Sequence, residues 1–234
     1  MARAARIVIP GLPHHVVQRG EAGREVFGSD ADRLAYLQML GQQARRFGVG
    51  ILGYCLMRDH VHLVVLPRTK ASLALAVGRT HWLYTQHVNR LHGRHGHLWQ
   101  NRFFSCALDE PHLADVLLYV ERNPVRARLV RYPWTYRWSS AAAHANGADP
   151  AGLIDPAPWR KISTPSQWRS LLVRPDAEDL ARRICLSTST GRPLATDPTL
   201  NRLERRLGRR LRALPVGRPK KKPGRSATPV RRHA

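Results

Sequence analysis

Two apolar segments separated by a very short turn limit the fold more than any other feature of the sequence. Residues 49–57 and 61–66 both have strand length and are rich in aliphatic residues. The short Arg58-Asp59 turn joins them, and Pro67 ends the second segment. Strands joined by so short a link must run antiparallel. We therefore predict a β-hairpin in this part of the chain.

The elements around the hairpin complete a recognisable order. Residues 14–19 and 103–108 are predicted strands, and residues 30–47 and 71–91 are predicted helices, the first of them capped by Ser29. The resulting order is strand, helix, strand, strand, helix, strand. We predict an α+β fold with a ferredoxin-like βαββαβ sheet and helices on one face. Its third strand should lie centrally, beside the first, and a C-terminal helical and basic extension should follow.

The composition changes near residue 146 and again near residue 197. Residues 1–145 are predicted to be the catalytic domain, and a helix over 112–122 within it should end at Asn123-Pro124. Residues 146–196 are predicted to be a Pro-rich, partly ordered arm, with Trp159 and Trp168 packed back onto the main domain. Residues 197–234 are predicted to form a basic amphipathic helix and a disordered tail.

The charge of the chain points to a polyanionic partner. The formal net charge is +23, with 39 Lys and Arg against 16 Asp and Glu. Such an excess favours nucleic acid as the partner. No apolar segment approaches the roughly 18 residues that a membrane span needs, and no apolar signal region follows the N-terminus. We therefore expect a cytoplasmic, nucleoid-associated protein with no membrane contact.

Two pairs of residues have a spacing that suits phosphodiester chemistry. His60 and His62 point to the same face of a strand, where they can share a metal ion, although two solvated histidines at a strand end would show the same pattern. Tyr119 and Asn123 lie four residues apart on one helical face. Tyr119 is a candidate nucleophile, although a tyrosine near a helix end often only packs. Asn123 is a candidate third ligand for Mg²⁺ or Mn²⁺, and nitrogen ligands favour Mn²⁺.

The motif around His60 and His62 resembles that of a known family. Asp59-His60-Val61-His62-Leu63 is similar to the His-hydrophobic-His (HUH) signature of single-tyrosine transposases, and residues 119–127 are similar to their nucleophile helix. Residues 18–20, 96–103 and 138–140 add similarity to the REP-associated tyrosine transposases, over about residues 5–145 in all. Asp59 departs from the family pattern, in which asparagine is common.

The resemblance implies an activity and a substrate. It implies that Tyr119 attacks single-stranded DNA to leave a 5′-phosphotyrosine and a free 3′ hydroxyl, with His60, His62 and Asn123 as metal ligands. Family members bind a DNA hairpin beside a short single-stranded guide, and we expect this chain to be a monomer or a homodimer. The candidate DNA contacts in the catalytic domain are basic side chains: Arg19, Arg24, Arg79, Arg90, His95, His97 and Arg102. In the tail, Arg218 and Lys220 belong to a Gly-Arg-Pro segment similar to minor-groove binders, although a solvated basic tail with non-specific affinity for DNA is the favoured interpretation.

Two other interpretations compete with an enzyme. A non-catalytic DNA-binding protein, such as a repressor or nucleoid factor, would need only the charge and the basic tail. It would not need His60, His62, Tyr119 and Asn123 together. An RNA-binding domain on the same scaffold is disfavoured, because the strands lack an evident pair of exposed aromatic side chains for base stacking.

Overall fold

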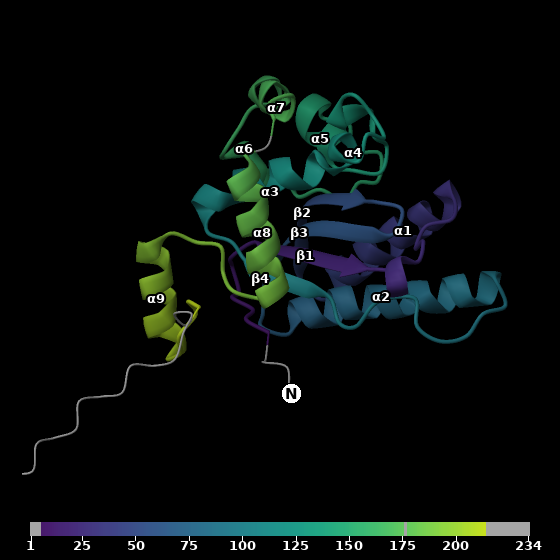
Figure 1. Ribbon diagram of the computed structural model, residues 1–234, viewed down its shortest axis with the longest axis horizontal. Coiled ribbons are helices and arrows are strands. Elements are labelled where there is room, and N and C mark those ends of the chain that lie inside the picture. Colours follow the sequence, from purple (N-terminus) through teal and green to yellow (C-terminus); the bar gives the residue numbers. More distant parts are fainter. Residues whose placement is uncertain (1–5, 176, 214–234) are drawn as a thin grey trace, which may run out of the picture.

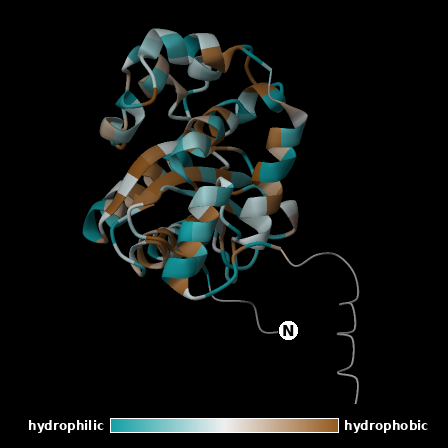
Figure 2. Ribbon diagram, turned by 90° about the vertical axis from the view of Figure 1, so that its left-hand side faces the viewer, coloured by the Kyte–Doolittle hydropathy of each residue, from teal (hydrophilic) through white to brown (hydrophobic). Residues whose placement is uncertain are grey.

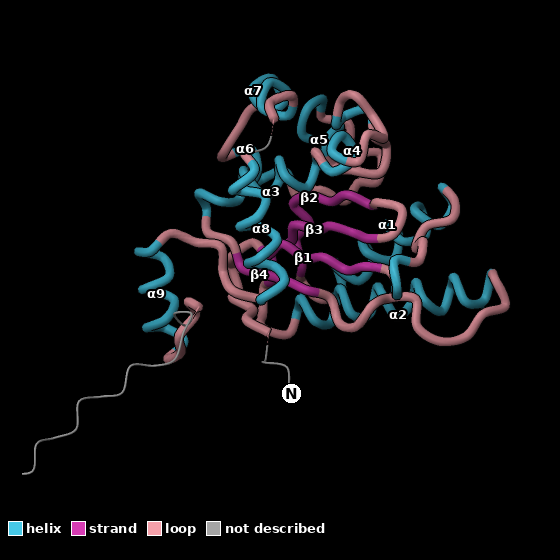
Figure 3. Tube along the Cα trace, in the orientation of Figure 1, coloured by secondary structure: helices cyan, strands magenta, loops and turns pink. Residues whose placement is uncertain are grey.

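Four strands form one antiparallel sheet in a computed structural model that describes residues 6–175 and 177–213. They are β1 (His14–Arg19), β2 (Val49–Leu56), β3 (His60–Pro67) and β4 (Phe104–Ala107). Their order in the sheet is β2-β3-β1-β4, as Figures 1 and 3 show. The predicted hairpin and the ferredoxin-like order are confirmed, and β3 lies centrally, beside β1.

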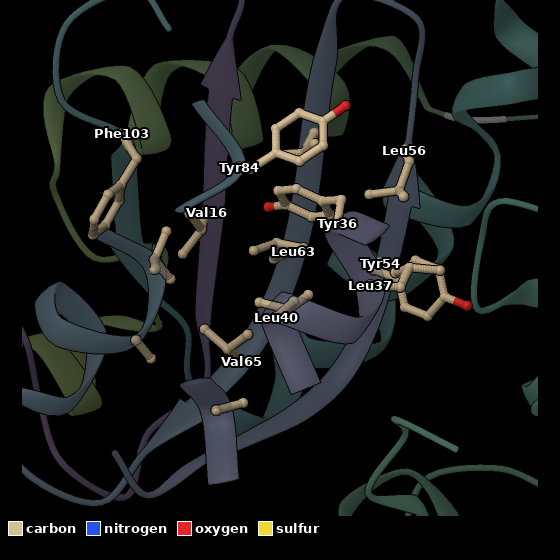
Figure 4. Packing of buried hydrophobic residues seen from close by; sticks show 14 of the residues in the cluster. Val16, Tyr36, Leu37, Leu40, Tyr54, Leu56, Leu63, Val65, Tyr84 and Phe103 are labelled. Atoms are coloured by element: carbon tan, nitrogen blue, oxygen red, sulfur yellow. The ribbon is translucent and has the colours of Figure 1, made fainter. Parts of the chain in front are cut away.

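The two helices of the βαββαβ unit cover one face of the sheet, as predicted. They are α1 (Asp30–Arg46) and α2 (Ser72–Leu91). Helix α1 begins with a reciprocal capping box between Ser29 and Asp32. Figure 4 shows Leu37 and Leu40 of α1 packed over β3 side chains, among the aromatic rings of this core. Burial of these apolar side chains fixes α1 on the sheet.

The opposite face is covered by helices that come later in the chain. They are α3 (Glu110–Glu121), α5 (Ala141–Asn146), α6 (Pro156–Arg160) and α8 (Glu178–Thr190), with α4 (Asn123–Arg126) following α3, while α7 (Pro165–Leu172) packs outside them on α3 and α5. Trp159 and Trp168 are both buried in this second core, as expected. In Figure 2 the hydrophobic colour gathers at the strands between the two helical layers. The predicted domain boundaries stay a prediction.

Helix α3 lies unusually close to β2, and a glycine permits this approach. A Cβ atom at Gly53 would lie 2.6 Å from Cδ2 of Leu117 in α3 and 3.2 Å from Oγ of Ser140. The register between β2 and β3 also shifts between Ile51 and Gly53. The absence of a side chain at Gly53 therefore leaves room for α3 to lie close to β2.

The C-terminal extension ends in a basic helix, α9 (Asp197–Leu207), which the sequence predicted. Its Leu203 is buried, and so is Leu211 beyond the helix end, both against Ile9 and Ala107. Arg212 forms ion pairs with Glu204 and Asp197. None of the helices in the described residues is both long and apolar enough to cross a membrane.

Two buried histidines should make the fold sensitive to acid. Burial lowers the pKa of His14 to about 4 and that of His81 to about 3. In the unfolded chain both titrate near pH 6.5, so below this pH the unfolded state binds more protons than the native state. We expect these histidines each to remove about 1.4 kcal/mol from the free energy of unfolding per pH unit, from pH 6.5 down toward 4. Denaturant unfolding at pH 7 and pH 5 measures this loss.

A variant separates this effect from general acid sensitivity. His81→Phe should lose stability less steeply with falling pH than the wild-type chain does, whatever its stability at pH 7. An equal slope in both proteins would contradict the assignment to His81.

Candidate active site

The two histidines of the predicted motif lie on the sheet face that α3 and α8 cover. In the β1–β3 pairing, His60 is opposite Arg19 and His62 is opposite Val17. Alternate residues of a strand share a face, so His15, Val17 and Arg19 of β1 face the same way as the two histidines. The pair therefore lies in the middle of the sheet and beside a cationic side chain.

Tyr119 of α3 lies directly against these histidines. Its ring centre is 5.8 Å from that of His62 and 6.1 Å from that of His15, and both contacts are edge-to-face. The Tyr119 hydroxyl lies 3.3 Å from Sγ of Cys185 in α8. The guanidinium of Arg126 lies 4.1 Å from the centre of the Tyr119 ring. The structure thus brings the predicted nucleophile to the predicted ligands from a separate element.

Asn123 is placed one turn beyond Tyr119, at the start of α4. Its buried side chain donates from Nδ2 to the backbone carbonyls of Tyr119 and Val120, both at 3.1 Å. Those bonds satisfy carbonyls at the end of α3, where the helix stops before Pro124. Because these bonds use Nδ2 of Asn123, its Oδ1 remains the atom that can accept a hydrogen bond or coordinate a metal ion. Within the described residues, the hydrogen bonds of the Asn123 side chain go to α3 and not to the histidine pair, and its role as a ligand stays a prediction.

Burial keeps both motif histidines neutral. Desolvation lowers the pKa of His60. Desolvation lowers the pKa of His62 well below its usual value, with a further contribution from the neighbouring His15. Nδ1 of His60 lies 2.6 Å from Oδ1 of Asp59. Because a carboxylate accepts, His60 donates from Nδ1 and carries its lone pair on Nε2.

The two histidines could bind a divalent ion, provided that other groups complete its coordination. Among the residues that the structure describes, no group of three His, Cys, Asp or Glu side chains is placed to hold a metal. Two neutral imidazoles, one of them oriented by a carboxylate, are nevertheless typical of metal-binding histidines. Such an ion would need further oxygen ligands, which Asn123, a substrate phosphate or water can provide.

A buried carboxylate fixes the end of α3 two residues after Tyr119. Glu121 is fully buried and accepts hydrogen bonds from Ser140, from Nδ1 of His144 at 2.6 Å and from Nε1 of Trp168 at 2.8 Å. These partners lie in or beside α5 and α7. Glu121 therefore ties the helix that carries Tyr119 to the outer helical layer.

Removal of this carboxylate should destabilise the whole chain. In a Glu121→Ala variant the buried Nδ1 of His144 and Nε1 of Trp168 lose their acceptor, and we expect the free energy of unfolding to fall by about 3 kcal/mol or more. Glu110→Ala is the matched control, because Glu110 is exposed in the first turn of the same helix. It should change stability by less than about 1 kcal/mol. Equal denaturation midpoints for the two variants would contradict this role.

The predicted DNA contacts do not gather around the histidine pair, because Arg79 and Arg90 belong to α2, which covers the opposite face of the sheet. Arg19 is exposed beside His60. Arg24, Arg79, Arg90, His95, His97 and Arg102 are also exposed, on the turn after β1, on α2 and on the segment between α2 and β4. Arg90 and His95 line one groove, and His97 and Arg102 line another together with Trp82. Arg218 and Lys220 lie outside the described residues.

Three residues of the site were not among those predicted from the sequence. One is His15, whose Nε2 lies 3.0 Å from Nδ1 of His62. Cys185 and Thr188 come from α8, a helix that the sequence did not predict. A signal existed for His15 alone, because strand alternation and the predicted β1–β3 pairing place it on the histidine face.

Comparisons with known proteins agree with the fold. Residues 9–123 match the model of the family described as "Transposase IS200 like". The solved structure of a REP-associated tyrosine transposase bound to a REP hairpin superposes with a TM-score of 0.54, over 64% of this chain and 90% of that chain. The sequences are 17% identical, so this likeness establishes the fold alone.

Other comparisons add little. A crystal structure from Deinococcus radiodurans R1 is 20% identical over 52% of this chain and 97% of that chain, but its TM-score of 0.35 is too low to support an argument. The sequence has no match among curated proteins.

Proposed function

Residues 9–123 form a domain of the IS200-like transposase family, and from this premise we propose that the chain cuts and rejoins single-stranded, hairpin-forming DNA through Tyr119. The observation that carries the proposal is the position of the Tyr119 ring, 5.8 Å from the ring of His62 on the same face of the sheet. A DNA-binding protein without catalysis has no use for a tyrosine beside two neutral histidines.

The proposed reaction is a transfer of the phosphodiester to tyrosine. The Tyr119 oxygen attacks the scissile phosphorus, and the bond between phosphorus and the 3′ oxygen breaks. The phenolic proton goes to solvent, and the departing 3′ oxygen takes a proton from solvent. The products are a 5′-phosphotyrosine on the enzyme and a free 3′ hydroxyl, and the reverse step rejoins a strand. No bond energy is lost to hydrolysis, so the protein can exchange strands without a nucleotide cofactor.

His60, His62 and the Asn123 amide oxygen are the proposed ligands of a Mg²⁺ or Mn²⁺ ion. Such an ion, when bound, withdraws charge from the scissile phosphate and favours in-line attack. The chain itself contributes two cations near the same place. Arg126 lies over the Tyr119 ring, and Arg19 lies beside His60. Both can hold phosphate oxygens and so orient the strand.

Hairpin DNA is the proposed substrate because of fold and charge together. The structure with the same fold is bound to a REP hairpin. The exposed cations of this chain at Arg90 and Arg102 line grooves on the segment that follows α2. Contacts of this kind hold phosphates without reading bases and depend strongly on salt.

A cleavage assay with three matched oligonucleotides tests the proposal. The full chain is incubated with a hairpin that has single-stranded flanks, with an unstructured strand of equal length and with a full duplex, in Mn²⁺ or Mg²⁺. The proposal predicts a covalent protein–DNA adduct on denaturing gels for the hairpin, less for the unstructured strand and none for the duplex. Absence of an adduct with hairpins taken from around its own gene, in both metals, would contradict it.

A further inference from the structure

A line of hydrogen bonds runs from α8 through β1 to the motif strand β3. Oγ1 of Thr188 lies 2.8 Å from the Ile184 carbonyl and 2.8 Å from Nδ1 of His15. Nε2 of His15 lies 3.0 Å from Nδ1 of His62. Thr188, His15 and His62 are all buried, with exposed fractions of 3%, 1% and 4%. Water therefore does not compete for these bonds. Each of the three contacts is a hydrogen bond only if one proton lies between its two atoms.

The direction of every bond follows from the carbonyl at the end of the line. A carbonyl oxygen only accepts, so the single hydroxyl proton of Thr188 lies between Oγ1 and the Ile184 oxygen. The contact between Thr188 and His15 must then use a proton on Nδ1 of His15. The two ring nitrogens of the buried His15 face the Thr188 hydroxyl and Nδ1 of His62, neither of which is an anion, so a second ring proton would leave an uncompensated charge in the core. Nε2 of His15 is consequently an acceptor, and His62 must donate from Nδ1.

The geometry of the two rings shows that His15 supports His62 and does not share its ligand role. The rings are parallel within 2°, and their centres are 5.3 Å apart. This separation is close to the 3.0 Å between the nitrogens plus one ring radius on each side, so the two rings lie edge to edge with the nitrogens in line. Lone pairs on these two nitrogens would point at each other, whereas ligands of one ion must converge on it from an angle. A hydrogen bond is the only arrangement that fits.

We propose that His15 and Thr188 are positioning residues that fix His62 in the tautomer with its lone pair on Nε2, the atom that would meet the metal ion. This inference rests on the proposed function, since it takes His62 as a ligand. Asp59 has the same effect on His60 through a carboxylate. His60 is thus oriented by a carboxylate at the surface of the site, whereas His62 is oriented by His15 and Thr188 in the core. Thr188, which begins this line of hydrogen bonds, belongs to α8 and lies outside residues 9–123, the part of the chain that matches the family model.

Two substitutions at Thr188 separate this role from packing. Thr188→Val keeps the shape of the side chain but removes the acceptor for Nδ1 of His15. The buried His15 then favours a proton on Nε2, which it donates to Nδ1 of His62, and His62 carries its own proton on Nε2. Thr188→Ser keeps the hydroxyl, loses a methyl group and should retain the wild-type tautomers. A purely steric effect would make Thr188→Ser the more disruptive substitution, because it changes the shape of the side chain. The proposed role makes Thr188→Val the more disruptive one.

Long-range ¹H–¹⁵N NMR of the metal-free full chain, labelled at histidine, reads the tautomers directly. Wild type and Thr188→Ser should show His62 protonated on Nδ1, and Thr188→Val should show it protonated on Nε2. A wild-type His62 protonated on Nε2 would overturn the inference. So would a Thr188→Val variant with the wild-type tautomer, and neither result depends on activity.

Titration with Mn²⁺ followed by calorimetry or by electron paramagnetic resonance gives the second readout. We expect Thr188→Val to weaken Mn²⁺ binding about 10- to 100-fold, and Thr188→Ser to stay within about twofold of wild type. Equal affinity in all three proteins would overturn the inference while the covalent adduct of the wild type still supports the proposed function. The predicted tautomers in a wild-type chain that forms no adduct would instead refute the proposed function alone.

Discussion

A Tyr119→Phe variant should form no covalent adduct with hairpin DNA and should bind the same hairpin as the wild-type chain does. The substitution removes only the hydroxyl that is proposed to attack phosphorus. The ring contacts with His62 and His15 remain, because they involve carbon atoms of the ring. Without a nucleophile, we expect strand cleavage to fall by at least about a thousand-fold. Denaturing gels measure the adduct, and a mobility shift measures the binding.

Tyr132→Phe is the matched control for this experiment. Tyr132 is 38% exposed and stacks on Trp134, away from the histidine pair. Its loss of a hydroxyl should leave both cleavage and binding at the wild-type level. An adduct that persists in Tyr119→Phe at the wild-type rate would assign the nucleophile elsewhere.

A His60→Ala variant should lose metal-dependent cleavage while it keeps its fold. His60 is the more exposed of the two proposed ligands, and it forms its hydrogen bond with Asp59 at the edge of the site. Its removal leaves one imidazole, so we expect adduct formation at a fixed Mn²⁺ concentration to fall by at least about a hundred-fold. Excess chelator should reduce wild-type cleavage to the same level. Circular dichroism reports whether the fold is retained.

His92→Ala provides the control for the loss of an imidazole as such. His92 is exposed at the C-terminal end of α2. Its removal should not change the metal dependence of cleavage. Cleavage that proceeds equally well in chelator and in Mn²⁺ would contradict the role proposed for His60 and His62.

The core of the fold follows from local signals in the sequence. A three-residue link makes the hairpin of β2 and β3 unavoidable, Ser29 and Asp32 mark the start of α1, and α3 ends shortly before Pro124. These features act over a few residues, so they can be recognised without knowledge of tertiary contacts. The same holds for the shared face of His60 and His62.

The outer helices follow from contacts that are distant along the chain. The start of helix α8 is not marked by a side-chain cap. It is held by buried residues such as Ile184 and by the bond from Thr188 to His15, 173 positions away. Nothing in the local sequence of α8 indicates these partners. The part of the site that α8 supplies, Cys185 and Thr188, was for this reason missed.

The role of His15 shows how far strand alternation alone can lead. Alternation places His15 on the face of the motif histidines, but it does not distinguish a packed imidazole from one that donates or accepts beside a ligand. That distinction needs the 3.0 Å contact with His62 and the hydroxyl of Thr188 on the other side.

The most direct test of the central proposal identifies the residue that becomes linked to DNA. The wild-type chain is incubated with a hairpin substrate and Mn²⁺, the adduct is digested with nuclease and trypsin, and the modified peptide is sequenced by mass spectrometry. We predict a nucleotide joined by its 5′ phosphate to Tyr119. A nucleotide on any other residue, or cleaved DNA without a modified peptide, would contradict it.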